Sequence, residues 1–174
     1  MRTEMEKNIK TIVSLIIVVG LAFVLSSFVT QYLIASIPIE GDSMEPTIHH
    51  EDRAIVYRLA QPEYGDIIIF YSEPHNKTLV KRLIGLPGDR IEIKREEDGI
   101  FVFRNGEKLI EPYINEKMEY SQDEVIVGEG QFYYLGDNRN HSSDSHSGYI
   151  GEMDKIVGVV FLRVNIRNFD FAVV

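Results

Sequence analysis

The chain has 174 residues, of which 44% are hydrophobic and 26% charged, and this composition excludes both a disordered polar chain and a bundle of membrane helices. Its formal net charge of −9 argues against a nucleic-acid-binding protein, which normally presents a basic surface. The sequence has no cysteine, which excludes disulfides, thiolate nucleophiles and cysteine-ligated metal centres.

The N-terminal part of the sequence predicts one membrane-spanning helix. None of residues 11–39 is charged, and this run exceeds the about 20 apolar residues that cross a bilayer. A buried core helix would not need so long an uncharged run, and a cleaved secretory signal has a shorter apolar region followed by a small-x-small site. Pro38 disfavours any continuation of the helix. We therefore predict an uncleaved anchor over residues 11–37.

The charges beside this span predict its orientation in the lipid bilayer. Arg2, Lys7 and Lys10 precede the span, and the next basic residue after it is Arg53. Because Lys and Arg are retained on the cytoplasmic side, residues 1–10 should be cytoplasmic. The protein is then a single-pass protein of the cell membrane, with an extracytoplasmic domain at 38–174.

That domain reads as mainly β, with a folded-sheet or barrel-like architecture. Its β-branched, aromatic and alternating segments predict strands at 66–71, 91–94, 125–127, 131–135 and 156–162. Asn105-Gly106 stands inside the segment 100–109 and is a strong hairpin signal. The acidic, turn-rich region at about 92–130 is interpreted as an insertion of hairpins and loops with a variable surface.

Two segments suggest a nucleophile and its base. Ser43 follows the span directly, although a serine there also fits a simple turn. Lys81 stands among apolar residues, where a lysine either extends its amine to water or, if desolvated, has a lowered pKa. A neutral lysine can activate a serine hydroxyl. A Ser–His–Asp triad is less favoured, because no histidine lies in an apolar strand.

A third segment, residues 135–145, is a dense polar cluster that follows an aromatic strand. It reads either as a solvated loop or as a group of short side chains that orient the Lys81 amine or pair with Arg82. Its histidine and carboxylate spacing fits no standard ligand pattern. We therefore predict no metal and no cofactor.

Four motifs stand in chain order, Ser43-Met44-x-Pro46-Thr47, Gly65-Asp66-Ile67-Ile68-Ile69-Phe70, Lys81 to Asp89, and Gly136-Asp137-Asn138-Arg139 with Ser142-x-Asp144-Ser145. Together they resemble type I signal peptidases, the membrane-bound serine–lysine endopeptidases that remove signal peptides from exported preproteins. The compact layout is similar to the Gram-positive-style bacterial members.

The resemblance implies a Ser/Lys dyad in which Ser43 is the nucleophile and Lys81 the general base. It implies that Ser142 orients the lysine amine, and that Arg82, Asp137 and Asp144 form a supporting charge cluster. A signal peptide would bind as an added strand and be cut after a small-x-small site. Its small side chains would enter shallow pockets flanked by Ile39, Met44, Ile48 and Val80.

Three other interpretations remain open. A self-cleaving repressor-type Ser–Lys peptidase is disfavoured by the N-terminal anchor. A catalytically inactive family member could act as a membrane-tethered module that binds preproteins, although it would be expected to have lost Ser43 or Lys81. The third is a purely structural anchored β-domain, which labelling of Ser43 by a serine-directed acylating reagent would exclude.

Overall fold

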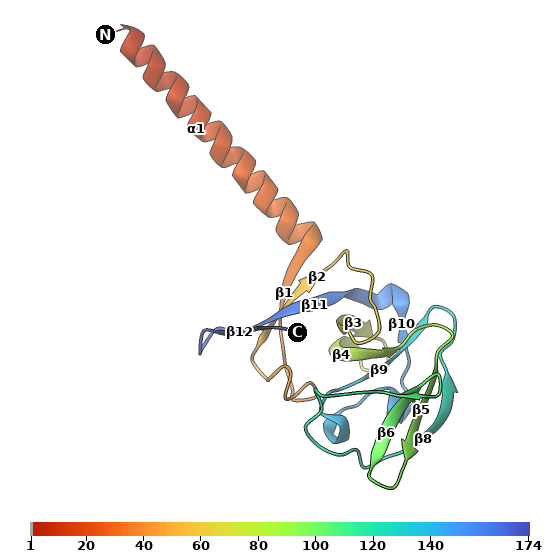
Figure 1. Cartoon of the computed structure of the whole chain (residues 1–174). Coiled ribbons are helices and arrows are strands. Elements are labelled where there is room, and N and C mark those ends of the chain that lie inside the picture. Colours follow the sequence, from red (N-terminus) through yellow and green to blue (C-terminus); the bar gives the residue numbers. More distant parts are fainter. Residues whose placement is uncertain (1) are drawn as a thin grey trace. The chain divides into compact units, whose positions relative to one another are not determined.

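The computed structural model describes residues 2–174, which divide after Ala35 into two compact units (Figure 1). The first is dominated by helix α1 (Arg2–Phe28), which continues as a π-helical turn, η1 (Val29–Leu33). Within residues Lys7–Leu33, an 18-residue window has a mean hydropathy of 2.8, and most of the large apolar side chains of this span are exposed. A helix that is apolar all round is stable in lipid or in a protein core. The helical span ends at Leu33, and residues 34–37, which the sequence analysis assigned to the anchor, lie in the first strand.

The second unit is built mainly from antiparallel strands. The large sheet has the order β1-β2-β11-β3-β4-β9-β10, and β12 pairs with β11. Its strands are β1 (Ile34–Pro38), β2 (Arg53–Tyr57), β3 (Ile67–Ser72), β4 (Lys77–Gly85), β9 (Gln131–Leu135), β10 (Gly151–Glu152), β11 (Ile156–Asn165) and β12 (Asp170–Val173). Three short 3-10 turns complete the unit, η2 (Arg139–His141), η3 (Ser145–Ser147) and η4 (Met153–Lys155).

The small sheet has the order β7-β6-β5-β8 and contains most of the predicted insertion. Its strands are β5 (Arg90–Arg95), β6 (Ile100–Arg104), β7 (Glu107–Lys108) and β8 (Gln122–Ile126). Asn105 and Gly106 join β6 to β7 with positive φ angles of 54° and 82°, as a tight hairpin turn requires. The predicted mainly β fold class is confirmed.

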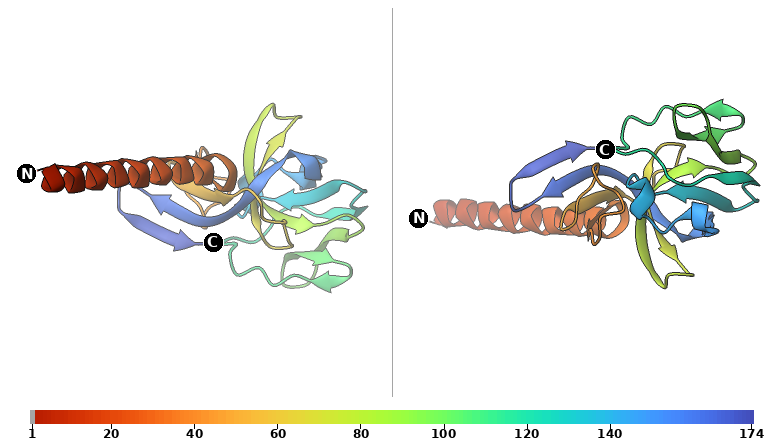
Figure 2. Two further views of the ribbon diagram at one scale, coloured as in Figure 1. Left: turned by 90° about the horizontal axis from the view of Figure 1, so that it is seen from above. Right: turned by 90° about the horizontal axis from the view of Figure 1, so that it is seen from below.

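Strands β4 and β9 lie between two hydrophobic cores. In β9, Tyr133 and Leu135 pack against the small sheet, whereas Phe132 and Tyr134 pack on the opposite face with Phe70. Side chains alternate between the two faces of a strand, so one strand can contribute to both cores. Figure 2 shows the small sheet, in green, packed beside the large one. Because it is packed on both faces, this part of the sheet is a rigid support for a site.

Candidate active site

The loop between β1 and β2 carries Ser43, and backbone hydrogen bonds close its neck. Ile39 N–H donates to Asp52 O at 2.9 Å, and Glu51 N–H donates to Ile39 O at 3.0 Å. Gly41 turns the chain with a φ of 91°, a conformation that favours glycine. The closed neck limits the positions that Ser43 can take.

Two buried apolar side chains anchor this loop to the interior of the domain. Met44 and Ile48 are 1% and 0% exposed, and Ile48 N–H donates to Met44 O at 2.9 Å within the loop's turn. Burying such a side chain stabilises the fold by about 1.5–3 kcal/mol, which explains why the turn directs both inward. The structure thus places Met44 and Ile48 in the interior and not along the cleft that contains Ser43, whereas the resemblance had put them beside substrate pockets.

Lys81 lies on β4, directly opposite Ile68 of β3. Its side chain is 3% exposed, and its Nζ donates to Ser43 Oγ at 2.6 Å and to Val80 O at 3.1 Å. The structure therefore brings the candidate nucleophile and base together from positions far apart in the sequence.

Burial lowers the pKa of Lys81 to about 8, because a charged amine loses hydration in this site. The carboxylates of Asp144 and Asp137 oppose this effect, and the charge of Lys77 adds to it. A lysine with such a pKa is partly neutral near neutral pH. A neutral amine at hydrogen-bond distance from a hydroxyl can accept its proton.

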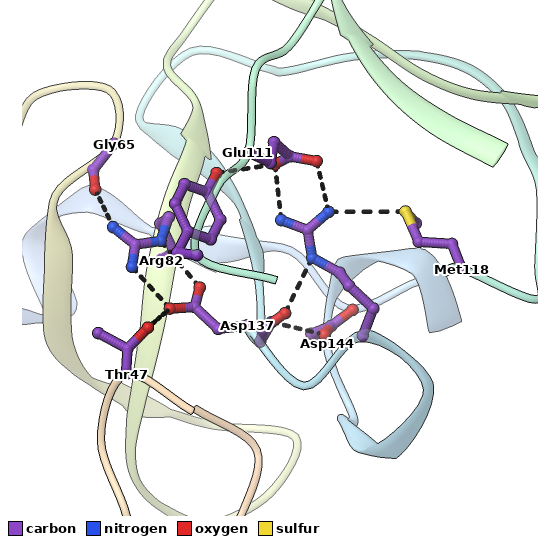
Figure 3. Close-up of polar contacts among 10 residues, drawn as sticks. Thr47, Gly65, Arg82, Glu111, Met118, Asp137 and Asp144 are labelled. Carbon is purple, nitrogen blue, oxygen red and sulfur yellow. Dashed lines mark hydrogen bonds and ion pairs between the residues drawn. The ribbon is translucent and has the colours of Figure 1, made fainter. Parts of the chain in front are cut away.

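A buried ion pair joins Arg82, the residue that follows Lys81, to Asp137 (Figure 3). Arg82 donates from Nε to Asp137 Oδ1 at 2.8 Å and from Nη2 to Asp137 Oδ2 at 2.6 Å, and its Nη1 donates to Gly65 O. Asp137 Oδ2 also accepts from Thr47 Oγ1 at 2.5 Å. Because Thr47 belongs to the Ser43 loop, Asp137 ties that loop to β4.

Replacing Asp137 with asparagine is expected to lower the free energy of unfolding by about 3–5 kcal/mol, because it leaves the buried Arg82 guanidinium without its counter-charge. Denaturant unfolding of the full chain in detergent measures this loss. The control is Asp123→Asn at an exposed position of β8, which should change stability by less than about 0.5 kcal/mol. Equal losses in the two variants would contradict the role of the pair.

Residues 136–148 form a loop that Asp144 holds together. The Asp144 carboxylate is fully buried and accepts from Gly136 N–H at 2.8 Å and from His146 Nδ1 at 2.6 Å. Ser145 Oγ accepts from Tyr134 N–H at 3.0 Å, which fixes the loop to β9. Asp144 is therefore a structural centre of the loop as well as a negative charge near Lys81.

This loop contacts the nucleophile segment directly. Asn138 N–H donates to Ser43 O at 3.1 Å, and Asn138 Nδ2 donates to Asp42 O at 3.0 Å. A Cβ placed on Gly136 would lie 2.4 Å from Ser43 O and 2.3 Å from Ser142 Oγ, too close for any side chain. The approach of the two segments thus depends on glycine at position 136.

Ser142 lies beside this contact, with its Oγ buried. Within residues 2–174 that oxygen has no hydrogen-bond partner, so the contact with the lysine amine that the resemblance implies is not formed. The hydrogen bonds of the Lys81 amine go instead to Ser43 Oγ and Val80 O. The hydroxyl can rotate about its Cα–Cβ bond, and a buried hydroxyl without a partner is costly to retain.

A cleft of about 470 Å³ opens over the dyad. Ile39 and Val80, both predicted at substrate pockets, line it. The remaining lining comes from residues 37–43, from β4, from Ile69 of β3 and from three polar side chains, His75, His141 and Ser143. A cleft lined by extended segments of this kind suits an extended peptide.

Sequence reasoning missed Glu111 and Tyr113 as parts of this site. Glu111 accepts two hydrogen bonds from Arg139, and the Tyr113 ring lies 3.8 Å from the Arg82 guanidinium carbon. Both residues belong to the region interpreted as a variable insertion. No local pattern distinguishes Glu111 from the other acidic residues there, so only the fold reveals its place.

Comparisons with known proteins identify a family that this chain matches. Residues 8–165 match the family described as signal peptidase, peptidase S26. The chain is 33% identical to signal peptidase IB of Staphylococcus aureus (strain COL), covering 88% of this chain and 90% of that protein. It is 36% identical to signal peptidase I of Bacillus licheniformis, and this match covers 78% of this chain and 77% of that protein.

A crystal structure of a signal peptidase I from Enterococcus faecalis V583 is similar over 58% of this chain and 97% of its own, with 31% identity and a TM-score of 0.49. The relatives' names support a peptidase, and hence a hydrolase. Together with the N-terminal apolar helix, they indicate a membrane-anchored protein. The chain therefore belongs to the signal peptidase family, peptidase S26.

Proposed function

We propose that this chain is a serine endopeptidase that cuts signal peptides from secreted preproteins after a small-x-small site, with Ser43 and Lys81 as its dyad. The observation that carries the proposal is the 2.6 Å contact between Lys81 Nζ and Ser43 Oγ, formed by a buried lysine whose pKa is lowered to about 8. Serine supplies the attacking oxygen, and the neutral amine supplies the base.

In the first step, Lys81 takes the Ser43 proton while Oγ bonds to the scissile carbonyl carbon. The carbonyl oxygen becomes an oxyanion, to which the Ser43 backbone N–H would donate, a contact often worth about 10²–10³-fold in kcat. The Lys81 ammonium then gives its proton to the leaving amine, and the C–N bond breaks. Water, deprotonated by Lys81, cleaves the acyl-enzyme and returns Ser43 to its starting form.

The neighbouring polar groups would hold this dyad in place. Ser142 is proposed to rotate toward the Lys81 amine, because both its hydroxyl and the Ser43 carbonyl lie against Gly136. Arg82 and Asp137 would fix β4 relative to the Ser43 loop, and Asp144 would fix the 136–148 loop. A lysine oriented by acceptors on several sides presents its lone pair to Ser43 and not to water.

The substrate is proposed to lie extended in the cleft, as a strand added beside residues 39–43 and residues 79–81 of β4. Ile39 and Val80 would bound shallow pockets for the first and third side chains before the cut. Met44 and Ile48 would shape the cleft from beneath. The aliphatic side chains of Ile39 and Val80 would leave room for small residues and exclude large ones.

The membrane topology is part of the same proposal. The anchor would place residues 1–10 in the cytoplasm and the domain 38–174 on the outer face of the bilayer, as the basic residues before the span favour. Signal peptides and lipid are then the partners, with nucleic acid and metal playing no part. Ser43 follows the span by only a few residues, which holds the nucleophile near membrane-embedded substrates and lowers the entropic barrier.

Cleavage specificity tests the proposal. The full chain in lipid vesicles should cut a preprotein that has alanine at the first and third positions before the cut. Phenylalanine at the first position should lower kcat/KM by more than about 100-fold, because it overfills the pocket. Phenylalanine at the second position is the matched control and should be cut at the parent rate. Equal rates for all three would contradict the small-x-small rule.

A further inference from the structure

Residues 111–120, hereafter the strap, run without regular secondary structure against the 136–148 loop. Glu119 N–H donates to Asn140 Oδ1 at 2.9 Å, and Asn140 Nδ2 donates back to Lys117 O at 2.9 Å. These reciprocal hydrogen bonds fasten the strap to the loop that contacts the nucleophile. The strap is therefore more than a surface insertion.

The strongest link between the two segments is a buried ion pair (Figure 3). Arg139 donates from Nη1 and Nη2 to the two carboxylate oxygens of Glu111, at 2.8 and 2.6 Å. The Arg139 side chain is 0% exposed and that of Glu111 is 5% exposed. The third nitrogen, Arg139 Nε, donates to Gly136 O at 3.0 Å. One guanidinium thus connects the strap to the glycine beside Ser43.

Tyr113 extends this link toward the second buried arginine. Its hydroxyl donates to Glu111 Oε1 at 2.7 Å, and its ring lies 3.8 Å from the guanidinium carbon of Arg82. A cation over a tyrosine face is attracted to the ring, the more so when both are desolvated. The strap therefore contacts both buried arginines, Arg82 and Arg139.

We infer that Glu111 is a positioning residue of the reaction, an inference that rests on the proposed function. Glu111 fixes the Arg139 guanidinium, whose Nε holds the Gly136 carbonyl. Gly136 lies close to Ser43 O, and Asn138 N–H donates to the same oxygen at 3.1 Å. Through these contacts, the position of the strap helps to determine the position of Ser43.

The charge of Glu111 is essential to this role. A buried guanidinium keeps one orientation only if its donors are matched by a charged, two-pronged acceptor. Glutamine at this position has the same size, but it offers one acceptor and no charge. Arg139 would then turn toward other acceptors or water, and its hydrogen bond to Gly136 O would weaken.

Steady-state kinetics of the full chain test the inference. Glu111→Gln should lower kcat per folded molecule by about 10²-fold, the cost of a displacement near 1 Å at a reacting group, while KM stays close to the wild-type value. The matched control is Glu119→Gln, whose exposed side chain lies on the same strap and should leave kcat unchanged. Equal kcat values for Glu111→Gln and wild type would overturn the inference.

A second variant separates positioning from general stability. Arg139→Lys keeps a cation beside Glu111, but its single nitrogen cannot occupy the places of both Nη and Nε. We expect this variant to fold, as thermal unfolding would show, and to have the same lowered kcat. A folded Arg139→Lys protein with wild-type kcat would show that the arginine only stabilises the fold.

Amide hydrogen exchange at Asn138 gives a readout that needs no activity. Because Asn138 N–H donates to Ser43 O, its exchange should be faster in Glu111→Gln than in Glu119→Gln or wild type. Unchanged exchange would overturn the inference even if kcat falls. If the wild-type chain cleaves no preprotein, the proposed function fails, and the exchange result still decides whether Glu111 positions the nucleophile segment.

Discussion

Replacing Ser43 with alanine should reduce kcat for preprotein cleavage by about 10⁶-fold, with KM little changed. The variant keeps the cleft and loses the attacking oxygen, and serine peptidases lose rates of this size when the nucleophile is removed. Single-turnover cleavage of a labelled preprotein by the full chain in detergent measures the effect. The structure also indicates a small steric change, because only the Oγ that accepts from Lys81 is removed.

Ser121→Ala is the control for this experiment. Ser121 is exposed and precedes β8, so the same chemical change there should leave kcat at the wild-type value. If Ser43→Ala also retains wild-type cleavage, Ser43 is not the nucleophile. If neither it nor the wild-type chain cleaves but both bind the preprotein, the chain is the inactive, membrane-tethered module.

Replacing Lys81 with methionine should have an effect of similar size. Methionine has a similar length and apolar character and therefore fits the buried site, but it cannot accept the Ser43 proton. In the wild type, kcat/KM should rise tenfold per pH unit at acidic pH and level off above about 8, because the neutral amine is the active form and burial lowers the pKa of Lys81 to about 8. Lys81→Met should show no such limb.

Lys77 provides the matched control for the pH profile. The charge of Lys77 lowers the pKa of Lys81, so Lys77→Met should raise that pKa and move the acidic limb to higher pH. The plateau should remain, since Lys77 is exposed and contacts neither dyad atom. The titration would belong to another group if the acidic limb of the kcat/KM profile did not move in Lys77→Met. The same conclusion would follow if that limb persisted in Lys81→Met.

The features that the sequence predicts are those with local causes. The Asn105-Gly106 turn depends on two residues that tolerate positive φ, and the strands follow from runs of β-branched and aromatic residues. The apolar neighbours of Lys81 limit its amine to two outcomes, contact with water or desolvation with a lowered pKa, and the burial seen in the structure selects the second. The turn and the strands can therefore be predicted before any long-range contact is known.

The remaining features depend on contacts between distant segments. Glu111 resembles any other acidic residue until Arg139, which lies 28 positions later, is placed beside it. Met44 and Ile48 have the character of pocket residues, and only the turn of their loop decides that they point inward. The sequence likewise does not determine the hydrogen-bond partner of the Ser142 hydroxyl, because that partner depends on the rotation of the side chain in the folded protein.

The position of β11 in the large sheet determines how late in folding Ser43 and Lys81 can come together. In the order of the large sheet, β11 separates β1 and β2, the strands on either side of Ser43, from β3 and from β4, which carries Lys81. β11 pairs with β2 at one end and with β3 at the other, and it begins at Ile156, near the end of the chain. Contacts of such large sequence separation form late in folding. Ser43 and Lys81 should therefore come together late in folding, after β11 has paired with both β2 and β3.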